Sequence, residues 1–141
     1  MPASPLTELR RRCLSLPETY EKEAWGSATF RVTKGKIFAM FAINAQKTGR
    51  ARPEVWINSS TINQELLVAE SPDRYFVPPY VGPYGWVGVW LDRRPPWKTV
   101  QGLLEDGWKR AAPKRLLKAV TQSSESPAAG PKPKASRTAR R

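Results

Sequence analysis

Residues 28–43 read ATFRVTKGKIFAMFAI, and this stretch decides the fold. The β-branched and aromatic residues on both sides of Lys34-Gly35 are typical of two antiparallel strands, over 28–34 and 36–43, joined by a tight turn. The second run is apolar on both faces, so we predict that it lies in the middle of a sheet. Met40 and the phenylalanines of this hairpin are predicted core residues.

The segment before the hairpin carries a helix signal. Ser4 followed by Pro5 is typical of a helix start, and apolar residues then recur at helical spacing up to Leu16. We therefore predict a helix over 5–16 with Cys13 on its buried face. The chain has no His to activate a thiol, so we interpret Cys13 as a core residue rather than a nucleophile.

The chain beyond the hairpin alternates apolar runs with Pro- and Gly-rich breaks. Thr61 and Gln64 match a capping box, in which each side chain bonds the backbone N–H of the other residue. The Pro- and Gly-rich residues 78–85 exclude a central strand and indicate an ordered aromatic loop. The predicted elements are strands at 53–58, 75–77 and 86–91, helices at 61–70 and 97–111, and one or two basic helical turns at 114–120.

Composition indicates one small basic domain with a tail. The chain has 141 residues, and its 24 basic and 12 acidic side chains give a net charge of +12. Residues 121–141 contain no large apolar side chain, so we predict a disordered basic tail there and a folded α+β domain over 1–120. The tail has five basic residues and one acidic residue, which leaves +8 on the domain. A field of that sign attracts polyanions, nucleic acid first.

Several function classes are excluded by what the sequence lacks. With no His and one Cys, it cannot form a zinc-finger ligand set or a His-based triad, and it has no phosphate-binding loop motif. No apolar run is long enough to span a membrane, and the N-terminal residues lack the apolar stretch of a signal peptide, so we expect neither. We therefore expect a cytoplasmic, monomeric protein without metal or cofactor, and not an enzyme. Catalysis by carboxylate or Tyr side chains stays open as an alternative.

The order of short motifs in this chain resembles that of the MmcQ/YjbR family, over about residues 6–118. The motifs that carry the resemblance are Leu14–Pro17, Trp25-Gly26, Thr29–Val32, Gly35–Ala39, Tyr75–Gly82, Gly85–Val89 and Ala112–Leu116.

This resemblance implies an antiparallel sheet packed by helices at both chain ends. It also implies DNA binding, because the family is described by a proposed double wing of two hairpins, and it implies no established reaction. Many members carry a His near the position of Gly26. This chain has none, so any role of that side chain is lost or taken over by Trp25.

Two candidate sites follow from the residues. Basic side chains concentrate in the predicted loops and could contact phosphates of nucleic acid, DNA first. The alternative is a cleft around the aromatic loop that stacks bases or holds a small planar ligand or a peptide. The predicted phosphate contacts are Lys34, Lys36, Lys47, Arg50, Arg52, Arg93 and Arg94, and the predicted cleft residues are Arg31, Trp56, Tyr80, Tyr84 and Trp86.

Overall fold

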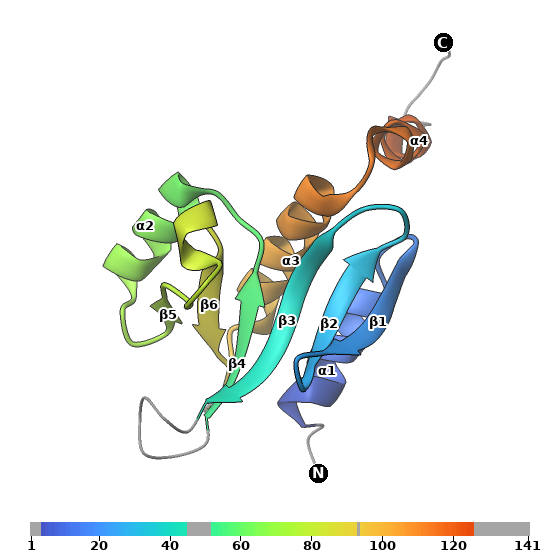
Figure 1. Cartoon of the computed structure of the whole chain (residues 1–141). Helices are drawn as coiled ribbons and strands as arrows, with labels where there is room; N and C mark the ends of the chain where they lie inside the picture. Colours follow the sequence, from blue (N-terminus) through green and yellow to red (C-terminus); the bar gives the residue numbers. More distant parts are fainter. Residues whose placement is uncertain (1–3, 45–51, 93, 126–141) are drawn as a thin grey trace. The chain divides into compact units, whose positions relative to one another are not determined.

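The computed structural model describes residues 4–44, 52–92 and 94–125. The chain divides into two compact units, Met1–Ala111 and Ala112–Arg141. The first unit is an α+β domain around one six-stranded antiparallel sheet (Figure 1), which confirms the predicted fold class.

The strands of the sheet are connected mainly as a meander. Their order is β1-β2-β3-β4-β6-β5, so β3 lies in the interior as predicted. The elements of the first unit are α1 (Pro5–Leu14), β1 (Thr19–Ala24), β2 (Ser27–Val32), β3 (Ile37–Asn44), β4 (Arg52–Ile57), α2 (Thr61–Glu70), β5 (Tyr75–Phe76), the 3₁₀ turn η1 (Gly82–Tyr84), β6 (Val87–Trp90) and α3 (Trp97–Ala111).

Strand β1 was not predicted from the sequence. Its residues Glu21, Lys22 and Glu23 have low strand propensity, which hides the strand from pattern reading. The strand forms because Thr19–Ala24 pairs in full register with Ser27–Val32. It lies at the edge of the sheet, where charged side chains are tolerated and discourage pairing with other chains.

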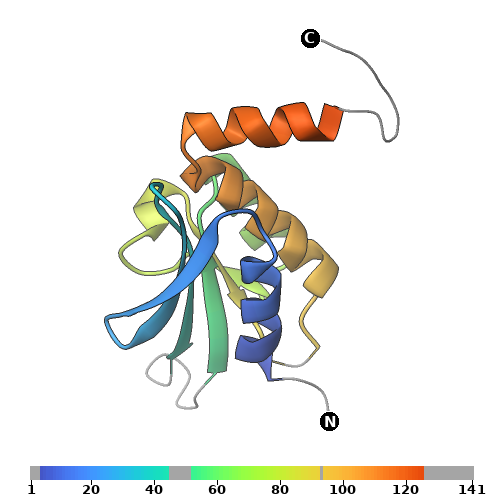
Figure 2. The same ribbon diagram turned by 90° about the vertical axis from the view of Figure 1, so that its right-hand side faces the viewer.

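The core lies between one face of the sheet and the helices α1 and α3, which lie on the same side (Figure 2). Alternate strand residues such as Phe30, Val55 and Val89 point to this side and are fully buried, as are Leu9 of α1 and Leu104 of α3. Since side chains alternate along a strand, the residues between them belong to the opposite face.

Helix α1 begins as predicted, because the Ser4 side chain accepts a hydrogen bond from the Thr7 N–H, but it ends at Leu14 rather than Leu16. Cys13 is fully buried on its inner face. Burial raises the pKa of the Cys13 thiol far above its ordinary value, and the Glu21 charge adds to the effect. The thiol is therefore protonated at neutral pH and is a poor nucleophile.

We expect Cys13→Ser to lower the free energy of unfolding by about 1 kcal/mol, because it places a hydroxyl in an apolar site. Urea denaturation of the two proteins measures this change. Ligand binding by the folded variant should be unaltered. Lost binding at unchanged stability would contradict the assignment of Cys13 to the core.

The predicted capping box at the start of α2 is wrong. The N-cap is Ser60, whose side chain accepts the Asn63 N–H at 3.1 Å. Gln64 turns away from the helix end and donates to the carbonyls of Gly82 at 2.9 Å and Trp86 at 2.6 Å. These two carbonyls are buried with Gln64, so they compete successfully for its amide.

The second unit contains α4 (Lys114–Glu125). This helix is longer than the one or two turns that we predicted and continues beyond Val120, the predicted end of the domain. Residues 126–141 of the predicted tail lie outside the described residues. None of the helices in the described ranges is long and apolar enough to cross a membrane.

Candidate ligand-binding hollow

The face of the sheet opposite α1 and α3 points toward the viewer in Figure 1, and no described helix covers β2, β3 or β4 on this side. A row of paired residues crosses it, from Lys22 through Thr29, Met40 and Trp56 to Gly88. Residues directly opposite each other on neighbouring strands share a face of the sheet. We call this surface the open face.

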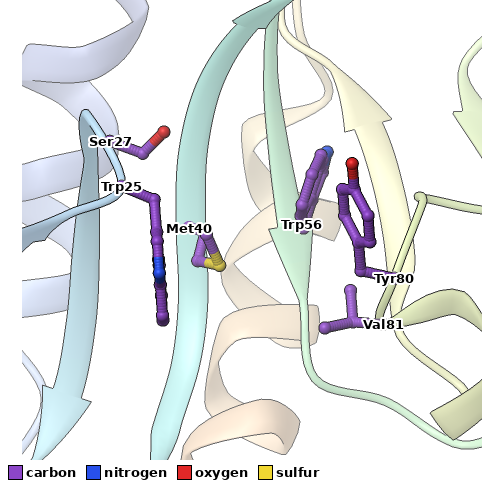
Figure 3. A pocket seen from close by; sticks show the side chains of 6 residues that line it. All are labelled: Trp25, Ser27, Met40, Trp56, Tyr80 and Val81. Carbon is purple, nitrogen blue, oxygen red and sulfur yellow. The ribbon is translucent and has the colours of Figure 1, made fainter.

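A hollow of about 530 Å³ lies on the open face. Figure 3 shows Met40 and Trp56 between Trp25 on one side and Tyr80 on the other. The prediction that Met40 belongs to the core is wrong, because its pairing with Thr29 and Trp56 turns it to the open face. The lining residues are Trp25, Ser27, Met40, Trp56, Tyr80 and Val81, so the lining is mostly apolar.

Trp25 stands at the turn between β1 and β2. Ala24 pairs with Ser27, so Trp25 and Gly26 form a two-residue loop, and both have positive φ, 54° and 75°. This combination is typical of a type I′ hairpin turn, for which Asn-Gly is the preferred sequence. A bulky residue in this conformation is strained, and Trp25 is 79% exposed, so the core gains little from its ring.

Tyr80 repeats this combination on the other side of the hollow. It lies between β5 and η1, has φ 67° and is 85% exposed. A bulky aromatic residue that is both strained and exposed points to a role outside the core. Two such residues face one hollow from segments far apart in the sequence.

The segment that carries Tyr80 is held against the start of α2. The buried Gln64 amide donates to the carbonyl of Gly82, at the start of η1, and to that of Trp86, two residues beyond its end. Gly85 has φ 92°, and a Cβ at this position would lie 2.7 Å from the Thr61 nitrogen. The close approach requires glycine and fixes the position of the Tyr80 side of the hollow.

The floor of the hollow is also fixed. The Trp56 indole N–H donates to the fully buried carboxylate of Glu54 at 2.7 Å. This bond occupies the polar edge of the ring. Arg52 lies beside Trp56 on the same face, with its Cζ 3.8 Å from the centroid of the Trp90 ring. Its Nε forms an ion pair with Asp92 Oδ2 at 2.8 Å. The floor therefore presents an ordered aromatic surface to any ligand.

The predicted cleft residues separate into three groups. Trp56 and Tyr80 line the hollow. Arg31 lies on the open face but is not a lining residue, Tyr84 is 78% exposed and also outside the lining, and Trp86 is buried. The predicted cleft did not include Trp25, although the family resemblance had already named this residue and Trp-Gly before a β-rich run is a turn signal.

The predicted phosphate contacts that fall within the described residues do not form one cluster. Lys34 and Lys36 are exposed at the β2–β3 turn, at one end of β3, and Arg52 lies at the other end. The eight residues of β3 separate these ends by about 25 Å. Arg94 is exposed just after β6, while Lys47, Arg50 and Arg93 lie outside the described residues.

The described residues contain no group of three or more His, Cys, Asp or Glu side chains that could hold a metal ion. The hollow is lined mainly by aromatic rings and a thioether. A surface of this kind suits planar or apolar groups.

Comparison with known proteins agrees with this fold. The crystal structure of the Deinococcus radiodurans protein DR2400, with a DUF419 domain, is similar at a TM-score of 0.60 and 19% identity, over 89% of this chain and 86% of that one. No curated protein matches the chain. The YjbR family model matches residues 14–110, which include both sides of the hollow. The chain therefore belongs to the YjbR family.

Proposed function

We propose that this protein binds single-stranded nucleic acid and seats an unpaired base in the hollow on its open face. The observation that carries the proposal is the pair of strained, exposed rings, Trp25 and Tyr80, on the two sides of a floor that contains Trp56. Stacking a base on an aromatic side chain contributes about 1–3 kcal/mol and tolerates every base. A duplex hides the base faces that such rings need.

The charge of the protein supports a nucleic-acid ligand. A net charge of +12 attracts a polyanion over several ångströms before any contact forms. The separation of Lys34 and Lys36 from Arg52, at opposite ends of β3, suits an extended strand that crosses the open face better than it suits a single contact point. In this arrangement the loops hold the phosphates, and the hollow supplies the stacking.

A second candidate is a small planar ligand that is not part of a nucleic acid. The mostly apolar lining favours it, because Ser27 contributes the one polar aliphatic side chain among the lining residues. The volume of about 530 Å³ is in the usual range for small-molecule sites. Binding of this kind depends little on salt, whereas phosphate contacts weaken steeply with it.

Fluorescence anisotropy with labelled oligonucleotides tests the proposal. We expect the full chain to bind a single-stranded ten-nucleotide probe more tightly than a hairpin duplex of equal phosphate number. The logarithm of the association constant should fall with the logarithm of salt concentration, by about 0.7 per phosphate contacted. Equal affinity for both probes would contradict base stacking and return attention to duplex binding by the loops.

A further inference from the structure

Arg31 of β2 lies on the open face, next to the row that forms the floor of the hollow. It pairs with Tyr20 of β1, and its Nε donates to the Thr29 hydroxyl at 3.1 Å. Thr29 itself is fully buried and sits opposite Met40, a floor residue. The bond therefore holds the guanidinium back toward the hollow, about one same-face strand position (~7 Å) from the floor row.

Arg31 differs from the arginines that serve the fold. Arg10 is bound to Glu21, Arg52 to Asp92 and Arg110 to Asp106. In the described part of the chain, no carboxylate forms an ion pair with Arg31, and the Thr29 contact uses only its Nε. Its two terminal NH₂ groups remain as donors, and a guanidinium end of this kind matches two oxygens of one phosphate.

Lys22 adds a second positive charge at the same place. It lies directly opposite Thr29 on β1, so its side chain belongs to the open face, and it is exposed. The neighbouring acidic residues Glu21 and Glu23 occupy alternate positions on β1 and face the other side. Lys22 and Arg31 therefore flank Thr29 on the β1–β2 side of the hollow.

We propose that Lys22 and Arg31 form an anion subsite beside the hollow, so that the ligand is a planar ring that carries a phosphate, that is, one nucleotide unit. This inference rests on the proposed function, because it places the phosphate next to the base held between Trp25 and Tyr80. The thioether and rings bind the base, and the guanidinium and ammonium bind the anion. The same chemistry is found in a free nucleotide and in a nucleotide within a strand.

The test compares ligands with and without the phosphate. Isothermal titration calorimetry measures the affinity of the full chain for adenosine, adenosine 5′-monophosphate and a single-stranded deoxyadenosine ten-mer. The variants are Arg31→Gln, which removes charge and donors, and Arg31→Lys, which keeps the charge but loses the paired donors. Lys109→Gln is the matched control, since it removes one charge from an exposed position on α3, across the sheet.

We expect Arg31→Gln to weaken binding of the monophosphate about tenfold and to leave adenosine binding unchanged, because only the charge-assisted bonds are lost. Arg31→Lys should recover part of this loss, and Lys109→Gln should match the parent protein. If the ten-mer responds to Arg31→Gln and the free nucleotide does not bind, the source of the phosphate is a strand.

The anion subsite is wrong if Arg31→Gln binds both phosphate-bearing ligands as tightly as Lys109→Gln does. The hollow would still stand in that case, since adenosine binding reports it separately. The converse result is also possible to recognise. If Arg31→Gln loses monophosphate binding but replacement of Trp25 and Tyr80 changes nothing, the anion subsite is supported and the proposed base stacking is contradicted. The two failures are therefore distinguishable.

Discussion

The double variant Trp25→Asn/Tyr80→Asn is expected to bind a single-stranded oligonucleotide about 10- to 100-fold more weakly than the parent protein. The estimate follows from the 1–3 kcal/mol that aromatic stacking contributes per base. Both rings are outside the core, at 79% and 85% exposure, so their replacement should weaken ligand binding without destabilising the fold. Anisotropy titration with the labelled ten-mer measures it.

The choice of Asn keeps the fold out of the measurement. Asn tolerates positive φ, and Asn-Gly is the preferred pair for a type I′ turn, so the β1–β2 hairpin should form at least as well as before. Thermal unfolding of the variant should therefore match the parent or occur at a higher temperature.

The matched control is Tyr84→Asn. Tyr84 is nearly as exposed as Tyr80 and lies only a few residues further along, in η1, but it does not line the hollow. Its replacement should change binding less than twofold. If Tyr84→Asn and the double variant weaken binding equally, the effect belongs to the segment as a whole, and the hollow is not the site.

Gly85→Ala should lower the free energy of unfolding by about 3 kcal/mol, the largest stability effect that we expect from a single methyl group here. Positive φ at 92° strains any L residue, and the new Cβ would lie 2.7 Å from the Thr61 nitrogen and 2.8 Å from the Ser60 carbonyl carbon. Both neighbours are backbone atoms at the start of α2, so they cannot move aside as a side-chain end can. Urea denaturation measures the loss.

Gly102→Ala provides the opposite result from the same chemical change. Gly102 lies inside α3, it is exposed, and a Cβ there meets no atom within 4 Å. Ala is favoured over Gly in a helix by about 1 kcal/mol, so this variant should be more stable than the parent. If both variants are destabilised equally, the close contact between η1 and α2 is not the cause.

Much of the fold could be predicted because its signals are local. The hairpin at 28–43, the Ser4-Pro5 helix start and the apolar spacing of 97–111 each depend on neighbouring residues, and each forms as predicted. The capping box failed for a reason outside the segment. Gln64 is drawn to carbonyls 18 and 22 residues away, which no local pattern reveals.

The candidate site depends on register, and register was only partly readable. Met40 looks like core in an apolar run, and only its pairing with Thr29 and Trp56 places it on the open face. The dispersion of the basic loops could have been predicted. Successive connections of a meander alternate between the two ends of a sheet, so Lys34, after β2, and Arg52, at the start of β4, had to lie apart.

The turn that carries Trp25 also gives the protein a built-in optical reporter. Among its tryptophans, Trp86, Trp90 and Trp108 are shielded by the core, whereas the Trp25 indole faces water. A collisional quencher such as iodide reaches this ring and spares the buried ones, so the emission divides into accessible and protected parts. Any molecule that enters the hollow covers Trp25 and shifts emission from the first part to the second, without a label on either partner.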